Sequence, residues 1–233
     1  MKKHYKLLLS ITIMTLSWMV QASDYPQFTR YTTEQLIDIA NPNKLKHRIF
    51  YENPSQGEHA AWFDAVKQGN ITLIKKMVAQ GQDIEVKDEA SFGQTALLWA
   101  AFIGYLDIVE YLVDERGANL FASDRADVQN VLKSAILGGN IDVINYLYPK
   151  LKNKISIDNQ DERDGETALM VAVDNNRIEA VKFLLDKGAA VNIVSQQLNL
   201  DAFNYACRKN NVVMIELLTS AGAVNHKTGK PDC

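Results

Sequence analysis

The chain contains 233 residues, of which 47% are hydrophobic and 23% are charged, so it is long enough to bury a sizeable core. Its 25 Lys and Arg against 28 Asp and Glu give a formal net charge of −3. This acidic balance excludes the strongly basic proteins that bind nucleic acid or an anionic membrane surface.

Residues 1–22 have the three parts of a secretory signal peptide. Residues 1–6 are basic, residues 7–20 form an apolar run too short for a comfortable membrane span, and Ala22 ends a small-residue cleavage sequence. An N-terminal membrane anchor is the alternative. The short lysine-led start is typical of bacteria, so we expect cleavage before Ser23 and a periplasmic chain without membrane contact. Loss of three lysines lowers the net charge from −3 to about −6.

Residues 23–54 match nothing else in the chain. Residues 32–40 predict a short helix that a Thr caps and that Asn41-Pro42 ends. We expect this segment to form an N-terminal helical cap on the rest of the fold, and a separate functional arm is the alternative.

A pattern with a period of about 35 residues follows. It reads TALLWAAFIG at 95–104, DIVEYLV at 107–113 and GAN at 117–119, and again GETALMVA at 165–172, VKFLL at 181–185 and GAAVN at 188–192. A small anchor residue recurs at spacings of 35, 35, 37 and 34, at Ala65, Ala100, Ala135, Ala172 and Ala206. Four residues later come Gly69, Gly104, Gly139, Asn176 and Asn210, nine later Ile74, Val109, Ile144, Val181 and Ile215, and twelve later Met77, Leu112, Leu147, Leu184 and Leu218. Agreement at these offsets predicts helix pairs that each bury one apolar face.

This pattern resembles the ankyrin repeat, whose signature is T-P-L-H-x-A followed by G-x-x-x-I-V-x-x-L-L-x-x-G-A. The resemblance implies an all-α ankyrin-repeat solenoid of about five helix-turn-helix repeats with short hairpin loops, over residues 55–225. The units fall at 55–88, 89–123, 124–160, 161–194 and 195–225, and a polar tail follows at 226–233. The third unit is irregular because it lacks the Thr, has Pro149 where its second helix should be finishing, and continues into a long loop at 150–163.

Two cysteines lie near the C-terminus. Cys207 follows the anchor of the last unit, on the side where a sixth unit would stack, and Cys233 is the final residue. In an oxidising compartment they can form a disulfide that ties the tail over this end and stabilises the fold by roughly 3 kcal/mol. The alternative is that Cys207 is a small buried residue and Cys233 a frayed end.

No motif for chemistry is recognisable, so we expect neither an enzyme nor a cofactor or metal. The histidines of the mature chain, His47, His59 and His226, form no metal-binding pair. An acidic cluster at 158–164 lacks the glycine and last glutamate of a calcium loop, which favours a solvated loop.

The resemblance implies that a partner protein binds the concave face of the first helices and the hairpin tips. The corresponding positions here are Phe92, Gln94, Phe102, Ile103, Arg125, Asp127, Leu137, Arg163, Asp164, Glu166, Asp174, Asn175, Arg208 and Lys209. We expect Phe102, Ile103 and Leu137 to form a solvent-facing apolar patch flanked by charge, as in a binding hot spot. For Phe102, packing under a neighbouring hairpin is the alternative.

These expectations indicate a protein-binding module that is a monomer when unbound. Small secreted bacterial ankyrin proteins resemble immunity proteins, so the favoured hypothesis is an inhibitor of a partner toxin or enzyme, such as a secreted antibacterial effector. A stress-protective or scaffolding protein that supports a periplasmic enzyme is the second hypothesis, and an enzyme with a site in the hairpins is a weaker third.

Overall fold

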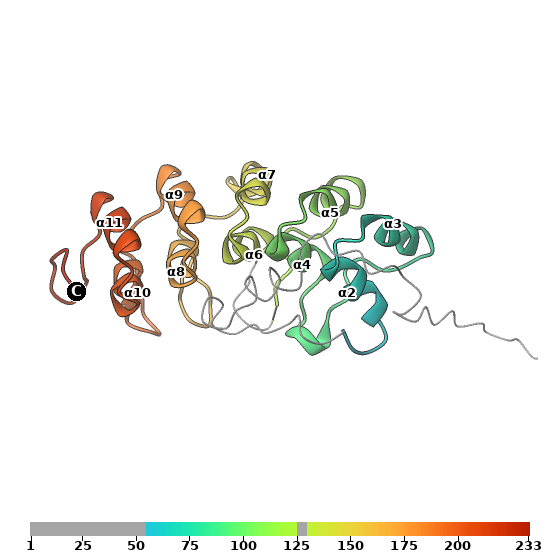
Figure 1. Ribbon diagram of the computed structural model, residues 1–233, viewed down its shortest axis with the longest axis horizontal. Helices are drawn as coiled ribbons and strands as arrows, with labels where there is room; N and C mark the ends of the chain where they lie inside the picture. The colour runs from blue at the N-terminus through green and yellow to red at the C-terminus, as the bar shows by residue number, and fades with distance from the viewer. Residues whose placement is uncertain (1–54, 125–129) are drawn as a thin grey trace, which may run out of the picture.

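The computed structural model describes residues 55–124 and 130–233 of the chain. The predicted signal peptide (1–22) and the predicted N-terminal cap (23–54) lie outside the described residues. In the described residues, helices pair into five units that lie side by side in chain order in one elongated row (Figure 1). The predicted all-α solenoid is therefore confirmed.

Each unit contributes one helix to each of two layers, and Figure 1 shows the second helices along the upper edge with the first helices below them. The first helices are α2 (Ala60–Lys67), α4 (Ala96–Ile103), α6 (Val131–Gly138), α8 (Ala168–Asp174) and α10 (Ala202–Arg208). The second helices are α3 (Ile71–Ala79), α5 (Leu106–Glu110) with its continuation η3 (Tyr111–Glu115), α7 (Ile141–Leu151), α9 (Ile178–Asp186) and α11 (Val212–Ser220). The loops between units contain the short helix η2 (Glu89–Ser91) and the antiparallel strands β1 (Val194–Ser195) and β2 (Leu200–Asp201), in which Val194 pairs with Asp201.

Side-chain caps start four of the first helices. The oxygens of Thr95, Asn130, Thr167 and Asp201 each accept a hydrogen bond from the N–H three residues later, at 3.4, 3.0, 3.3 and 2.6 Å. Such a cap satisfies a backbone donor that has no partner inside the helix. The third unit therefore starts normally, because Asn130 replaces the Thr that its sequence lacks.

The residues at the ends of the first helices also contact side chains of the next unit. Gly69 has a φ of +69°, and a Cβ there would lie 2.8 Å from the ring of Tyr105, whose hydroxyl donates to the Lys67 carbonyl at 3.0 Å. Two units later, Arg177 Nε donates to the Leu137 carbonyl in the same way, at 2.8 Å. The glycine signal in the sequence thus reflects both a left-handed backbone and a close approach between units.

The core lies between the two helix layers. Ile74, Val109, Ile144 and Val181 are fully buried, as are Leu112, Leu147, Leu184 and Leu218. The predicted register is confirmed for these residues, whereas Met77 and Ile215 are only half-buried.

Two second helices depart from the regular unit. In the second unit Gly117 follows its anchor by 17 residues, one more than the 16 that separate Gly81, Gly188 and Gly222 from theirs, and the π-helical turn η3 accommodates the extra residue. In the third unit the expectation that the helix finishes at Pro149 is wrong. Helix α7 continues to Leu151, because Pro149 lies in its last turn and the fully buried Leu151 holds that turn against the core.

Candidate protein-binding face

We define the first-helix face as the residues two and three positions after each anchor, a set that includes seven of the predicted contact residues. They are Lys67, Gln68, Phe102, Ile103, Leu137, Gly138, Asp174, Asn175, Arg208 and Lys209. Each pair lies in the last turn of a first helix, so the five helices present them as two parallel rows.

The apolar centre of this face is buried, so the expectation of a solvent-facing patch is wrong. Phe102 is 0% exposed, Ile103 2% and Leu137 8%. Helix α4 is apolar at every position and buried at every position, which is the behaviour of a helix without a polar face. The ring of Phe102 packs edge-on against Trp99 with 6.1 Å between centroids.

Backbone contact explains how closely the units pack there. A Cβ on Gly138 would lie 1.9 Å from the carbonyl oxygen of Phe102, so only glycine fits in α6 at this point. The resulting close approach of α4 and α6 helps to enclose their side chains. Phe102 therefore packs inside the protein and does not face solvent.

Several predicted polar contact residues are buried as well. Gln94, Glu166, Asp174 and Asn175 are all less than 9% exposed, so expecting them on an open surface was wrong. Arg125 and Asp127 lie outside the described residues. The exposed members of the predicted set are Phe92, Arg163, Arg208 and Lys209, while Asp164 is half-buried.

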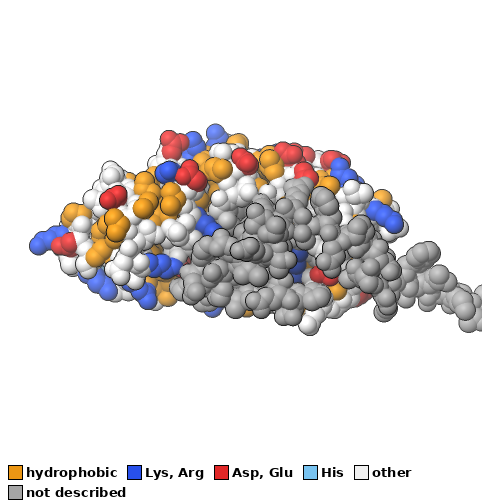
Figure 2. All heavy atoms as spheres, in the orientation of Figure 1, with side chains coloured by type: hydrophobic (Ala, Val, Ile, Leu, Met, Phe, Trp, Pro, Cys, Tyr) orange, Lys and Arg blue, Asp and Glu red, His pale blue; other side chains and the backbone are white. Residues whose placement is uncertain are grey.

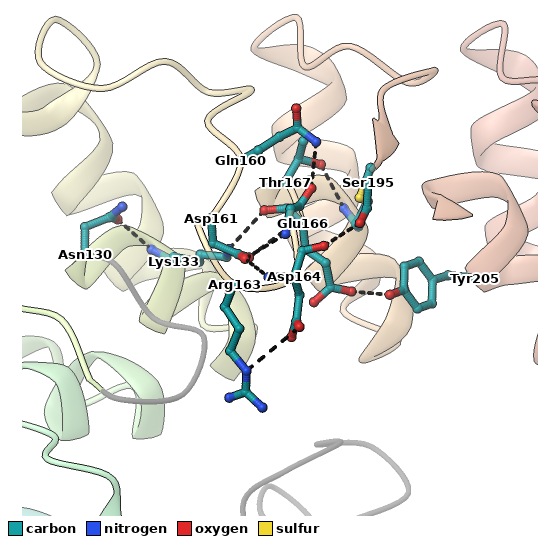
Figure 3. A network of polar contacts seen from close by, with 12 residues as sticks. Asn130, Lys133, Gln160, Asp161, Arg163, Asp164, Glu166, Thr167, Ser195 and Tyr205 are labelled. Atoms are coloured by element: carbon teal, nitrogen blue, oxygen red, sulfur yellow. Dashed lines mark hydrogen bonds and ion pairs between the residues drawn. The ribbon is translucent and has the colours of Figure 1, made fainter. Parts of the chain in front are cut away.

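A buried ion pair connects the third and fourth units (Figure 3). Lys133 Nζ in α6 lies 2.5 Å from Asp161 Oδ2 and also donates to the Glu166 carbonyl at 3.0 Å. Asp161 Oδ1 accepts hydrogen bonds from the N–H groups of Asp164 and Gly165 at 2.7 and 2.9 Å. Burial alone would raise the pKa of Asp161, but Lys133 and the two N–H groups outweigh it and hold that pKa below its usual range.

Hydrogen bonds connect the fourth and fifth units in the same region (Figure 3). The Ser195 hydroxyl donates to the Asp164 carbonyl, and the Tyr205 hydroxyl donates to Glu166 Oε1. Burial, and after it the bond to Glu166, raise the pKa of Tyr205 above its usual range. The acidic cluster predicted to be a solvated loop is thus partly structural, since Asp161 and the Asp164 carbonyl hold neighbouring units together.

A related pair lies within the first unit, and Trp99 of the second unit bonds to it. Lys67 Nζ lies 2.7 Å from Asp88 Oδ2 and donates to Ser55 Oγ at 2.7 Å. Trp99 Nε1 donates to the same Asp88 oxygen at 3.2 Å, and the Lys67 ammonium lies 4.5 Å from the centre of the Trp99 ring. The sequence analysis did not identify Lys67 or Lys133 as buried pairing residues. The signal that could have shown them is a lysine within a mostly apolar first helix, followed by an aspartate in the next hairpin loop.

The hairpin of the second unit differs from the others. Thr95 follows Asp88 by seven residues, whereas Thr167 follows Asp161 by six. The extra residue forms the turn η2 and leaves Phe92 in the left-handed region, with φ 60° and ψ 20°, and 41% exposed. This conformation costs a bulky residue about 1–2 kcal/mol relative to ordinary backbone, so Phe92 is an exposed aromatic held in a strained turn.

Charged side chains are also exposed at the other end of the row. Arg208 and Lys209 belong to the first-helix face, and Lys209 Nζ lies 2.9 Å from Asp174 Oδ1. On the face shown in Figure 2, basic side chains lie around the C-terminal end of the stack. The described part of the face is therefore apolar and enclosed in its middle and charged at its C-terminal end.

The described residues contain no group of three or more His, Cys, Asp or Glu side chains placed to hold a metal ion. A cavity of about 30 Å³ beside Lys133, lined in part by Ile157 and Leu184, has room for about one water molecule. None of the helices in residues 55–124 and 130–233 has the length and apolar character needed to cross a membrane.

Comparisons with known proteins agree with this architecture. The family described as "Ankyrin repeats (3 copies)" matches residues 62–161 and 150–229. The chain is 27% identical over 160 residues to the ankyrin repeat and KH domain-containing protein mask-1 of Caenorhabditis elegans. The matched segment is 68% of this chain and 6% of mask-1. It is 28% identical over 158 residues to the ankyrin repeat domain-containing protein SAT10 of Stachybotrys chartarum, covering 67% of this chain and 8% of that protein. An I-Kappa-B like protein C2 of Microplitis demolitor bracovirus is 24% identical over 122 residues, which are 52% of this chain and 67% of the viral protein.

The first two relatives are thus far longer than the segment they share with this chain. The family match, in contrast, extends over most of the residues in which the five helix pairs lie. The chain belongs to the ankyrin-repeat family.

Proposed function

We propose that the chain is a non-catalytic, periplasmic protein-binding module that binds and neutralises a partner toxin or enzyme. Ankyrin repeats generally mediate binding between proteins, and this chain consists largely of them. The proposal adds to that general role a cellular location, a class of partner and a binding surface.

The observation that supports binding rather than catalysis is the use of the buried ionisable groups. Lys133 pairs with Asp161 and Tyr205 with Glu166, and each of these two pairs joins one unit to the next. Lys67 pairs with Asp88 in the first unit, and Trp99 of the second unit donates to Asp88. Groups that are engaged in this way hold the stack together, and their charged or polar atoms already bind other parts of the protein.

The binding surface we propose consists of the hairpin tips and the C-terminal end of the first-helix face. Phe92 supplies an exposed aromatic anchor, and Arg163, Arg208 and Lys209 supply charge. Aromatic and arginine side chains dominate the energy of protein interfaces. The left-handed turn holds Phe92 with 41% of the residue exposed, so a partner can contact its ring.

The neutralising role follows from the predicted export and from the resemblance to small secreted immunity proteins. A scaffolding protein that supports a periplasmic enzyme is the second candidate. The two differ in what happens to the partner, because an inhibitor abolishes the partner's activity whereas a scaffold preserves or raises it.

The test begins with isolation of the partner by co-purification with the tagged protein from periplasm. Phe92→Asn should weaken binding of that partner by about 2 kcal/mol, since it removes the anchor while Asn still tolerates the left-handed backbone. Phe121→Asn is the matched control, because Phe121 is similarly exposed at 45% but is not among the residues assigned to the proposed surface.

Titration of the purified partner's activity then separates the two candidates. Loss of activity at one equivalent supports the inhibitor, and retained activity supports the scaffold. A Phe92→Asn variant that binds the partner at full strength would contradict the proposed surface.

A further inference from the structure

The chain returns toward the preceding unit after the last helix. Asn192 Nδ2 donates to the Gly222 carbonyl at 3.1 Å, and the N–H of Val224 donates to Asn192 Oδ1 at 3.0 Å. Ala223, which is 1% exposed, donates its N–H to the Leu218 carbonyl at 2.9 Å. Up to this point the chain follows the path that the earlier units take into their hairpins.

Residues 225–233, which we call the C-terminal strap, then form a closed loop. The N–H of Asn225 donates to the Lys230 carbonyl at 2.9 Å, and Asn225 Nδ2 donates to the Asp232 carbonyl at 3.3 Å. The Thr228 hydroxyl donates to Asp232 Oδ1 at 3.1 Å. These bonds shape the loop internally, so its attachment to the rest of the protein depends on other contacts.

One attachment is at the start of α10. The N–H of His226 donates to Asp201 Oδ2 at 3.1 Å, and His226 Nδ1 lies 3.0 Å from the same oxygen. Asp201 is also the residue that caps α10, through its bond from the N–H of Asn204. The strap therefore contacts the cap at the N-terminal end of this helix.

The other attachment is at the end of α10. Cys233 is joined by a disulfide to Cys207, which lies in the last turn of the helix, and the two Cα atoms are 5.4 Å apart. Lys227 to Cys233 are all exposed, so a reductant can reach the bond from the strap side. The strap thus spans α10 from cap to last turn, with one polar attachment and one covalent attachment.

We propose that the C-terminal strap is a redox-released clamp on helix α10. Helix α10 has seven residues, and a helix this short depends on tertiary contacts for its order. When the disulfide is intact, both ends of the helix are held; when it is reduced, only the His226 attachment remains and the last turn frays.

Release proceeds by thiol–disulfide exchange with a dithiol reductant. A thiolate of the reductant attacks Cys233 Sγ, the sulfur–sulfur bond breaks, and the Cys207 sulfur leaves as a thiolate that takes up a proton. The second thiol of the reductant then displaces the Cys233 sulfur, so the reductant ends as its own disulfide and the protein gains two thiols.

The clamp bears on recognition because α10 ends at Arg208, beside Lys209, and carries Tyr205 against Glu166. Fraying of the last turn would misplace both basic side chains of the first-helix face. This consequence rests on the proposed function, whereas the clamp itself does not.

The experiment is hydrogen exchange followed by mass spectrometry on the oxidised protein and on the same protein in dithiothreitol. We expect the amides of α10 to exchange about tenfold faster after reduction, while those of α8 keep their rates, because the strap does not attach to α8. Reoxidation should restore the slow exchange.

Two variants complete the test. Cys233→Ser without reductant should match the reduced wild type and should not respond to dithiothreitol. Lys230→Ser is the control, since it changes an exposed side chain of the strap and leaves both attachments in place, and it should match the wild type in both states.

Three results would overturn the clamp: equal α10 exchange in both redox states, an acceleration that extends equally to α8, or two free thiols in the protein before reduction. Each of them is independent of any partner, so the clamp can fail while the proposed function stands.

Discussion

The junction between α4 and α6 and the junction between α8 and α10 both join first helices of adjacent units, but their chemistry differs. In the first, every residue of α4 is buried and Gly138 lies directly against the Phe102 carbonyl. In the second, Tyr205 donates to Glu166, and Lys209 pairs with Asp174. One junction depends on a fixed volume and the other on directional polar contacts.

This difference shows how one repeat can enclose its side chains in one place and leave charge exposed in another. An apolar junction encloses its side chains, as the burial of Phe102 and Ile103 shows. A polar junction made by long side chains leaves part of them in solvent, as at Lys209. The C-terminal units can therefore hold together and still present charge.

The largest expected effect concerns the ion pair between the two junctions. Asp161→Asn leaves the buried ammonium of Lys133 without its counter-charge, which should lower the free energy of unfolding by about 3–5 kcal/mol in a urea titration. Lys182→Ala is the control, because its pair with Glu179 is exposed and should contribute less than about 1 kcal/mol. If Asp161→Asn lowers the free energy of unfolding by less than about 1 kcal/mol, the pair does not stabilise the fold as proposed.

The same pair predicts acid sensitivity. Because the pKa of Asp161 in the folded protein lies below its unfolded value of about 3.9, ionised Asp161 stabilises the fold at neutral pH, and this contribution is lost as the pH falls below about 4. Unfolding free energies measured from pH 7 to pH 3 should fall less steeply in the Asp161→Asn variant than in the wild type.

The core beneath the two junctions should respond alike. Leu112 and Leu184 are both 0% exposed at the same register of their units, so Leu→Ala at either should cost about 2–5 kcal/mol through lost burial and a cavity. Thermal melting compares the two variants directly. A variant that melts with the wild type would show that its unit is out of register.

A larger side chain should destabilise the junction between α4 and α6 more than a substitution at the matching position destabilises the junction between α8 and α10. Gly138→Ala places a Cβ 1.9 Å from the Phe102 carbonyl oxygen, so the helices must move apart at a cost of about 1–3 kcal/mol. Asn175→Ala is the change at the matching position, directly after α8; it adds no atom and removes only the hydrogen bond to the Val171 carbonyl, so it should cost less. If both variants unfold at the same urea concentration, the close approach of α4 and α6 does not limit stability.

The smallest effect belongs to the two neutral hydrogen bonds of the Ser195 hydroxyl, between the fourth and fifth units. Ser195→Ala removes the donor to the Asp164 carbonyl and the acceptor for the N–H of Leu198, which should cost about 0.5–1.5 kcal/mol. Urea unfolding measures it, and a loss above that of Gly138→Ala would reverse the proposed order of the two junctions.

Much of the fold could be predicted from the sequence because the repeat constrains it several times over. The anchors, helix-ending residues and apolar rows agree at fixed offsets, and the structure confirms the fold and most of the buried register. The pattern did not predict that α7 would continue past Pro149. Local signals set where a helix tends to end, but the burial of Leu151 outweighs them.

The candidate site was harder to predict, because the repeat fixes where a side chain lies along a helix and not what covers it. Phe102 and Leu137 occupy partner-facing positions of the family pattern and are nevertheless buried. In contrast, the exposure of Phe92 follows from one extra hairpin residue that leaves it in a left-handed turn.

By itself the sequence determined the architecture, most of the register and where the first helices end, because these depend on periodicity and on residues with strong local preferences. Only the tertiary structure decided which charged side chains form buried pairs between units and which remain exposed, since that depends on the distance between neighbouring units. Lys133 illustrates the point: its position in the helix pattern is readable from the chain, but its partner Asp161 lies 28 residues away and meets it only when the units stack.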